Sequence, residues 1–344
     1  MNIIDYVKKS KTSFLEKELN EVDSLVFSQL AYVNFCDKSK KYFTYFKDIE
    51  IEDVNFKEVN KLAVGGASNE KLVEALKKSN RFKDVKILEQ VIINNSKVSL
   101  SVTLFLLPTD EIYLAFRGSE GNLVSWVDNL ELIYHNDTPV SLEALKYAEE
   151  VLGKYSNNIY LGGHSKGGYL ALYTGLYLKD KKRIIKIFNH DGPGFILDMP
   201  KSFDDIKDRY CKTITNASVF GLLMNKEKYK VVYSDGTVIV DHLSYNWVVE
   251  KDHFEEAKLS PRAKKINKGL EDFVKDKSEE EREKLVNTIY KVVKASGERK
   301  FTSILKTFWI TVPKMILEAK DLSEEEKSLA GESIKLLYDL IVKS

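Results

Sequence analysis

Hydrophobic residues recur with two different periods in the first part of the chain. Over residues 20–35 and 69–79 they return every three or four positions, which predicts two amphipathic helices, the second of them capped by Asn69. Over residues 98–106 apolar side chains alternate mainly with Ser and Thr, which is the period of a strand. The turn-like sequence Pro-Thr-Asp-Glu then leads into the apolar run 111–116. We therefore predict a hairpin that feeds a sheet.

The middle of the chain repeats a pattern of strands and helices. A helix is predicted from about 141 to 152, followed by the apolar run 158–163, a helix that starts near residue 166, and another apolar run at 184–188. Strands that alternate with helices of about 10–15 residues are typical of parallel βαβ units. The expected fold class is therefore α/β, with a mainly parallel central sheet.

After about residue 255 the strand patterns stop and helical patterns replace them. The sequence Ser-Glu-Glu-Glu occurs at 278–281 and again at 323–326, and each copy matches a capping box followed by an apolar helical stripe. We predict an α/β unit over residues 1–254 and a helical subdomain over residues 255–344 that packs against it.

Charge and cysteine content remove several classes of protein. The chain has 344 residues, with 53 Lys plus Arg against 52 Asp plus Glu, so it lacks the concentrated positive charge that a nucleic-acid partner requires. Cys36 and Cys211 form neither a zinc-type pattern nor a disulfide framework. No apolar stretch reaches the roughly 18 residues of a membrane span, and the charged N-terminal segment does not resemble a secretory signal. We expect a cytoplasmic protein without nucleic acid, integral membrane insertion, metal or organic cofactor; peripheral membrane contact and the oligomeric state stay open.

The sequence Gly163-His164-Ser165-Lys166-Gly167 carries the strongest chemical signal. It lies between an apolar strand and a helix-compatible run, which is the setting of the nucleophile elbow G-x-S-x-G. Such a turn strains the serine and brings strand and helix close together, so both flanking positions need glycine. Ser165 is thus the candidate nucleophile. The alternative is a glycine turn in which Ser165 only caps the following helix.

A serine hydroxyl is a weak nucleophile, so a base must activate it and an acid must orient that base. In a site of this type the acid and the base follow the nucleophile in the order Asp or Glu, then His. His242 and His253 are the two candidates for the base. We favour His242, because it follows a strand-like run, whereas His253 lies in a charged stretch where the α/β pattern ends.

Asp191 is the favoured acid. It follows the apolar strand 184–190, and side chains at the carboxyl ends of parallel strands gather at one edge of the sheet. Its alternative role is to brace the loop 192–194 by accepting backbone hydrogen bonds. Asp235, in a Ser-Asp-Gly turn, and Asp241, directly before the base, remain as alternative acids.

Two backbone N–H groups are expected to bind the oxyanion that forms during acyl transfer. One belongs to Lys166, the residue after the nucleophile. The other belongs to Ser119, which follows a glycine at the point where the strand 111–116 ends. The Lys166 side chain is expected to face solvent, and Arg117 is expected to pair with Asp128.

Five segments carry a resemblance to a known family: NEVDSLVFSQLAY, FRGSEGNLVSWVDN, GGHSKGGYLALY, NHDGPGF and DHLSYNWVV. Together they look like the bacterial Mbeg-like family of α/β-hydrolases, and the FRGS segment is also similar to the oxyanion loop of class 3 (fungal-type) lipases. The resemblance covers nearly the whole chain. It implies Ser165 as the nucleophile, His242 as the base and Ser119 as an oxyanion residue.

The resemblance does not assign the acid. Class 3 lipases take their acid from the end of the next strand, where this chain has Asn216, Ala217 and Ser218. The sequence Asp191-Gly192-Pro193 is instead similar to pancreatic-type lipases, whose acid comes from the earlier strand end.

The sequence therefore predicts a serine hydrolase that cleaves a small-molecule or lipid-like ester through Ser165, His242 and Asp191. Two alternatives remain. One is a degenerate hydrolase fold that serves as a binding or scaffold protein, and the other is an acyltransferase that uses the same three residues.

Overall fold

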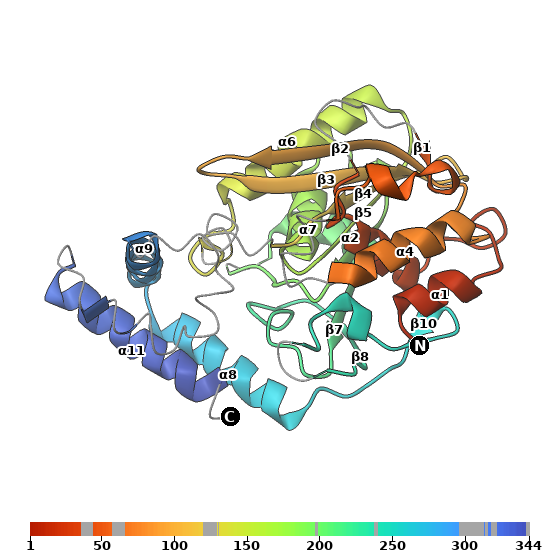
Figure 1. Ribbon diagram of the computed structural model, residues 1–344. Helices are drawn as coiled ribbons and strands as arrows, with labels where there is room; N and C mark the ends of the chain where they lie inside the picture. Colours follow the sequence, from red (N-terminus) through yellow and green to blue (C-terminus); the bar gives the residue numbers. More distant parts are fainter. Residues whose placement is uncertain are drawn as a thin grey trace.

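The computed structural model describes residues 1–35, 44–56, 66–119, 129, 131–196, 199–236, 240–295, 313, 316–317 and 322–341 (Figure 1). Asp128, the predicted partner of Arg117, lies outside these ranges, as does Cys36.

An eight-stranded sheet forms the centre of the molecule, with its strands in the order β1 to β8 (Figure 1). The first three pairings are antiparallel and the four that follow, from β4 to β8, are parallel. The predicted α/β fold with a mainly parallel sheet is confirmed, and so is the hairpin that feeds it. The strands are β1 (Thr44–Tyr45), β2 (Lys86–Asn94), β3 (Ser99–Leu106), β4 (Ile112–Phe116), β5 (Ile159–His164), β6 (Ile184–His190), β7 (Tyr210–Thr215) and β8 (Lys230–Val232).

Helices cover both faces of the sheet, and each face has its own hydrophobic cluster. Because side chains alternate along a strand, Tyr113 of β4 packs with the cluster of the first helices, whereas its neighbour Leu114 packs with the other cluster. One face carries α1 (Ile3–Lys9), α2 (Glu21–Leu30) and α4 (Gly66–Lys78), and the other carries α6 (Pro139–Lys154) and α7 (Lys166–Tyr177).

Helices α2 and α4 differ in how the polar side chains near their N-termini are hydrogen-bonded. α2 begins at a capping box in which Asn20 Oδ1 accepts the N–H groups of Val22 and Asp23. The predicted cap at Asn69 is wrong, because α4 begins at Gly66. Asn69 is buried inside that helix, and its side-chain oxygen accepts hydrogen bonds from Gln29 and Tyr245. The Asn69 side-chain oxygen is therefore hydrogen-bonded by residues distant in the sequence, and not by the backbone N–H groups of the helix N-terminus.

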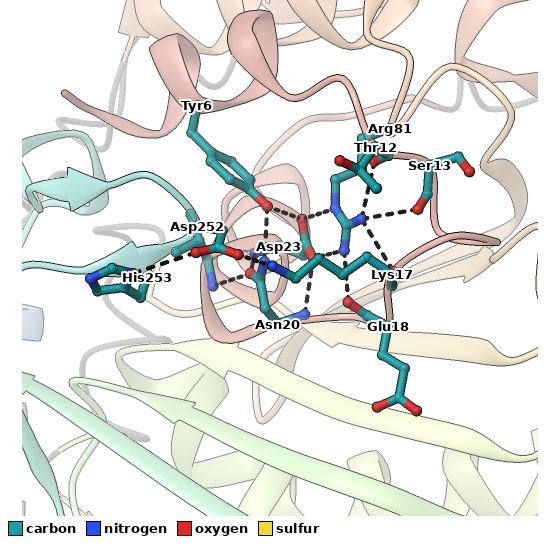
Figure 2. Close-up of polar contacts among 11 residues, drawn as sticks. Tyr6, Thr12, Ser13, Lys17, Glu18, Asn20, Asp23, Arg81, Asp252 and His253 are labelled. Atoms are coloured by element: carbon teal, nitrogen blue, oxygen red, sulfur yellow. Dashed lines mark hydrogen bonds and ion pairs between the residues drawn. The ribbon is translucent and has the colours of Figure 1, made fainter.

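A buried ion pair holds the N-terminal segment against α2, as Figure 2 shows. Arg81 is 3% exposed and donates through Nε and Nη2 to the two carboxylate oxygens of Asp23, at 2.7 and 2.5 Å. The Tyr6 hydroxyl donates to the same carboxylate at 2.8 Å. The remaining guanidinium donors bond the backbone carbonyls of Thr12, Ser13, Lys17 and Glu18. The pair is buried but fully hydrogen-bonded, which is the condition for tolerating buried charge.

The last described part of the chain is helical. A short hairpin, β9 (Val249–Glu250) and β10 (His253–Phe254), is followed by α8 (Pro261–Asp276), α9 (Glu279–Ala295) and α11 (Glu324–Ile341). Both predicted capping boxes are confirmed: the hydroxyls of Ser278 and Ser323 accept the N–H groups of Glu281 and Glu326, whose carboxylates bond back. None of the described helices is long and apolar enough to cross a bilayer.

α8 packs against the loop that follows β7. Ile266 and Leu270 share one hydrophobic cluster with Val219 and Leu223, and Ala263 shares another with Leu222 and with Ile214 of β7. The expectation that the helical segment packs on the α/β unit is therefore correct for α8, and its contact is the loop that continues into the candidate site.

Candidate active site

Ser165 lies in a sharp turn between β5 and α7. Its backbone has φ 59° and ψ −132°, a conformation that costs a non-glycine residue free energy and that clusters at functional sites. A Cβ on Gly163 would lie 2.3 Å from the Gly167 carbonyl oxygen, and one on Gly167 would lie 2.1 Å from the Phe116 oxygen. Strand and helix therefore touch at positions where only glycine fits, as a nucleophile elbow requires.

The Ser165 side chain does not cap α7. Within the described part of the chain its hydroxyl forms no hydrogen bond, to His242 or to any other residue, so the elbow presents an oxygen that is not committed to the fold. This finding weighs against the reading of Ser165 as a capping residue only.

Asp191 and His242 meet at the carboxyl end of β6. His242 Nδ1 lies 2.6 Å from Asp191 Oδ2, and the Asp191 side chain is fully buried. Asp191 also has a positive φ of 54°, and its N–H donates to the Thr213 carbonyl at 2.8 Å, which holds the residue against β7. Of the described carboxylates, Asp191 is the one that bonds the His242 ring.

The electrostatics of this pair set the tautomer of the histidine. Burial alone would raise the pKa of the Asp191 carboxyl, but the hydrogen bond and charge of His242 and the Ser218 hydroxyl outweigh it, so the pKa falls below its usual value. The carboxylate is thus ionised and accepts a hydrogen bond from the Nδ1–H group of His242. His242 Nε2 then carries no proton in the neutral ring, which is the state that a general base needs.

Ser218 is a site residue that sequence reasoning did not identify. Its hydroxyl donates to Asp191 Oδ1 at 2.5 Å, and it lies just after β7, where class 3 lipases place their acid. The loop after β7 supplies a brace for the carboxylate instead of the carboxylate itself. The same loop places the Phe220 ring 4.6 Å from the His242 ring. The available signal was the presence of two polar residues, Asn216 and Ser218, directly after the predicted strand.

His164 contacts the candidate base from the other side. Its ring lies 4.4 Å from that of His242, and its Nε2 lies 2.7 Å from the His242 carbonyl oxygen. Burial and the neighbouring His242 lower the pKa of His164 to about 3, so the ring is neutral. Because a carbonyl only accepts, Nε2 carries the proton and donates it. This bond fixes the backbone at the candidate base.

The two predicted oxyanion residues flank the elbow. Lys166 is the first residue of α7, so its N–H points out of the helix N-terminus beside Ser165. Ser119 follows β4 and is half-buried, and its hydroxyl accepts a hydrogen bond from Asn129 at 2.7 Å. A Cβ on Gly118 would lie 2.6 Å from the His164 carbonyl and 3.2 Å from Ser165 Cβ, so the Ser119 segment contacts the elbow directly.

The expectation that the Lys166 side chain faces solvent is wrong. The side chain is 2% exposed, and its Nζ lies 3.4 Å from the Ser99 carbonyl at the start of β3. The reason is that α7 is buried along almost its whole length between the sheet and its neighbours. The amine is thus directed to β3.

The remaining histidines and acids have other environments. His190 is buried between the hydroxyls of Ser24 and Thr213, and burial lowers its pKa to about 3. His253 is exposed beside Asp252.

The alternative acids have other partners than His242. Asp241 accepts hydrogen bonds from the Thr215 hydroxyl and the Ala217 N–H, and burial raises its pKa to about 6. The Asp235 N–H donates to the Asn246 carbonyl at 2.8 Å, next to the bridge between Ser234 and Trp247. In the described ranges, no three His, Cys, Asp or Glu side chains are grouped to hold a metal ion.

A strained serine between β5 and α7, on a mainly parallel sheet with helices on both faces, defines an α/β-hydrolase fold. The Mbeg1-like family profile matches residues 76–291, and the chain belongs to this family.

Three solved lipase structures are similar to the chain at low identity. A triacylglycerol lipase described as having a serine protease triad at its catalytic centre is 14% identical with a TM-score of 0.40, over 62% of this chain and 78% of that one. Lip2 lipase from Yarrowia lipolytica is 15% identical with a TM-score of 0.40, over 67% and 93%. Rhizomucor miehei lipase is 13% identical with a TM-score of 0.36, over 53% and 72%. No curated protein sequence matches the chain.

Proposed function

We propose that this protein is a serine carboxylic-ester hydrolase that works through Ser165, His242 and Asp191. The observation that supports it most is the 2.6 Å contact between His242 Nδ1 and the buried Asp191 carboxylate, at the same edge of the sheet as a strained serine whose hydroxyl forms no hydrogen bond with any described residue. A serine nucleophile requires an ionised acid, a base that accepts the hydroxyl proton, and a hydroxyl that is not held by the fold.

In this proposal His242 Nε2 takes the Ser165 proton as the hydroxyl oxygen attacks the ester carbonyl. The N–H groups of Lys166 and Ser119 bind the oxyanion, and His242 returns the proton to the departing alcohol. Water then attacks the acyl-enzyme by the same route and releases the acid. Asp191 orients His242 throughout and stabilises its protonated form.

For the substrate we propose a small-molecule or lipid-like ester. The balanced charge of the chain supports this class, because an acidic or basic polymer would favour a charged binding face. The two widely spaced cysteines support a cytoplasmic location.

Turnover of p-nitrophenyl esters of increasing acyl length tests the proposal. We expect hydrolysis by the unaltered protein and a loss of about 10⁶-fold in kcat for Ser165→Ala. Ser96→Ala, in an exposed turn, is the matched control and is expected to retain full activity. No turnover on any chain length by a folded protein would favour a scaffold role instead.

A further inference from the structure

Tyr32 places a hydroxyl group beside the candidate nucleophile, although it lies far from Ser165 in the sequence. It follows the end of α2 and is 3% exposed. A Cβ on Gly118 would lie 2.1 Å from the Tyr32 hydroxyl oxygen and 3.2 Å from Ser165 Cβ. The phenol oxygen therefore occupies the space that the missing Gly118 side chain leaves, between the Ser119 segment and the elbow.

The hydrogen bonds of His164 make its Nδ1 an acceptor for the phenol proton of Tyr32. His164 is neutral and donates from Nε2 to the His242 carbonyl, so its Nδ1 can only accept. The Tyr32 oxygen lies 3.4 Å from Nδ1, so the phenol can donate to this nitrogen, close to Ser165. At 3.4 Å this is a long hydrogen bond. A better acceptor on the other side of the hydroxyl can therefore replace it at little cost.

We propose that the Tyr32 hydroxyl is a third donor to the oxyanion and so a catalytic residue, an inference that rests on the proposed ester hydrolysis. When Ser165 Oγ bonds to the carbonyl carbon, the π electron pair moves onto the carbonyl oxygen. The Tyr32 O–H rotates from His164 Nδ1 and donates to that oxygen without giving up its proton. When the pair returns, the bond to the leaving alkoxide breaks, and His242 protonates the alkoxide.

The arrangement also assigns a purpose to Gly118. A side chain there would displace the phenol and would also collide with the His164 carbonyl oxygen at 2.6 Å, so both the hydroxyl and the elbow backbone require glycine at this position. Removing one donor from an oxyanion site typically lowers kcat about 10²-fold, since the developing charge is strongest in the transition state.

The test compares Tyr32→Phe with the unaltered enzyme on an ester and on the matching thionoester. Sulfur accepts hydrogen bonds weakly. We therefore expect kcat on the ester to fall about 10²-fold while kcat on the thionoester stays close to its original value, so that the ester-to-thionoester ratio collapses. The ratio does not depend on the fraction of folded protein. Tyr160→Phe, another buried tyrosine on the α2 face of the sheet, is the matched control and should leave the ratio unchanged.

An unchanged kcat on the ester would overturn the inference. Equal losses on both substrates would also overturn it, because a phenol that only braces His164 would slow both reactions alike. Lack of esterase activity in the unaltered protein would instead refute the proposed function, so the two failures are distinguishable.

Discussion

Ser218→Ala removes one of the two side-chain hydrogen bonds that the buried Asp191 carboxylate accepts. The hydroxyl lies 2.5 Å from Oδ1, and neither side chain has any exposed surface to let water replace it. A hydrogen bond to a charged group contributes about 1.5–3 kcal/mol, so we expect the free energy of unfolding at pH 7 to fall by that amount. The His242–Asp191 contact remains, so kcat should fall by about tenfold or less.

The loss of stability should depend on pH with a definite sign. The pKa of Asp191 lies below its usual value in the folded protein, so its ionised form stabilises the fold above about pH 4. That contribution to the free energy of unfolding is lost as the pH falls through the pKa that Asp191 has in the folded protein. Because Ser218 helps to lower this pKa, the difference between Ser218→Ala and the unaltered protein should shrink as the pH falls below about 4.

Urea unfolding at pH 7 and pH 3 measures this effect, and Ser234→Ala is the matched control. Ser234 is also buried, but its hydroxyl donates to a backbone group, the carbonyl oxygen of Asp241, at 2.8 Å. This acceptor carries no charge at any pH. Its loss should cost about 0.5–1.5 kcal/mol, equally at both pH values. If the cost of Ser218→Ala is the same at both pH values, the hydroxyl does not stabilise a charge and the reasoning is wrong.

Three further changes test other parts of the structure. Asp191→Asn should lower kcat by about 10⁴-fold in the p-nitrophenyl ester assay, and full activity would exclude Asp191 as the acid. Asp23→Ala strands the buried Arg81 charge and should cost about 3–5 kcal/mol in urea unfolding; a loss under about 1 kcal/mol would show that the pair is dispensable. Ile266→Ala should loosen the loop after β7 and lower kcat several-fold, whereas exposed Lys265→Ala should not, and equal activities would exclude α8 as a support of the site.

Local patterns predicted the scaffold because their physical causes are local. The strand period over residues 98–106 corresponds to β3 of the sheet, and the Ser278 and Ser323 capping boxes need only their own first turns. The elbow was predictable because its G-x-S-x-G pattern spans five residues, and a Cβ on Gly163 would meet Gly167 within that span. The contact that requires glycine at Gly167 is with Phe116 of β4, which the local pattern does not show.

The parts that could not be predicted depend on neighbours distant in the sequence. The Lys166 amine reaches β3, and Ser218 reaches Asp191 only after β6 and β7 have paired. Asn69 is satisfied by Gln29 and Tyr245, so its resemblance to a helix cap was misleading. Such contacts come from topology rather than from periodicity or propensity.

Covalent labelling tests the central claim most directly. The purified protein is incubated with a fluorophosphonate, and the intact mass and a peptide map are recorded. The proposed nucleophile predicts one adduct per chain, located on Ser165, absent from Ser165→Ala and much slower to form in His242→Ala. A folded, unaltered protein that stays unmodified, or one labelled at another residue, would contradict it.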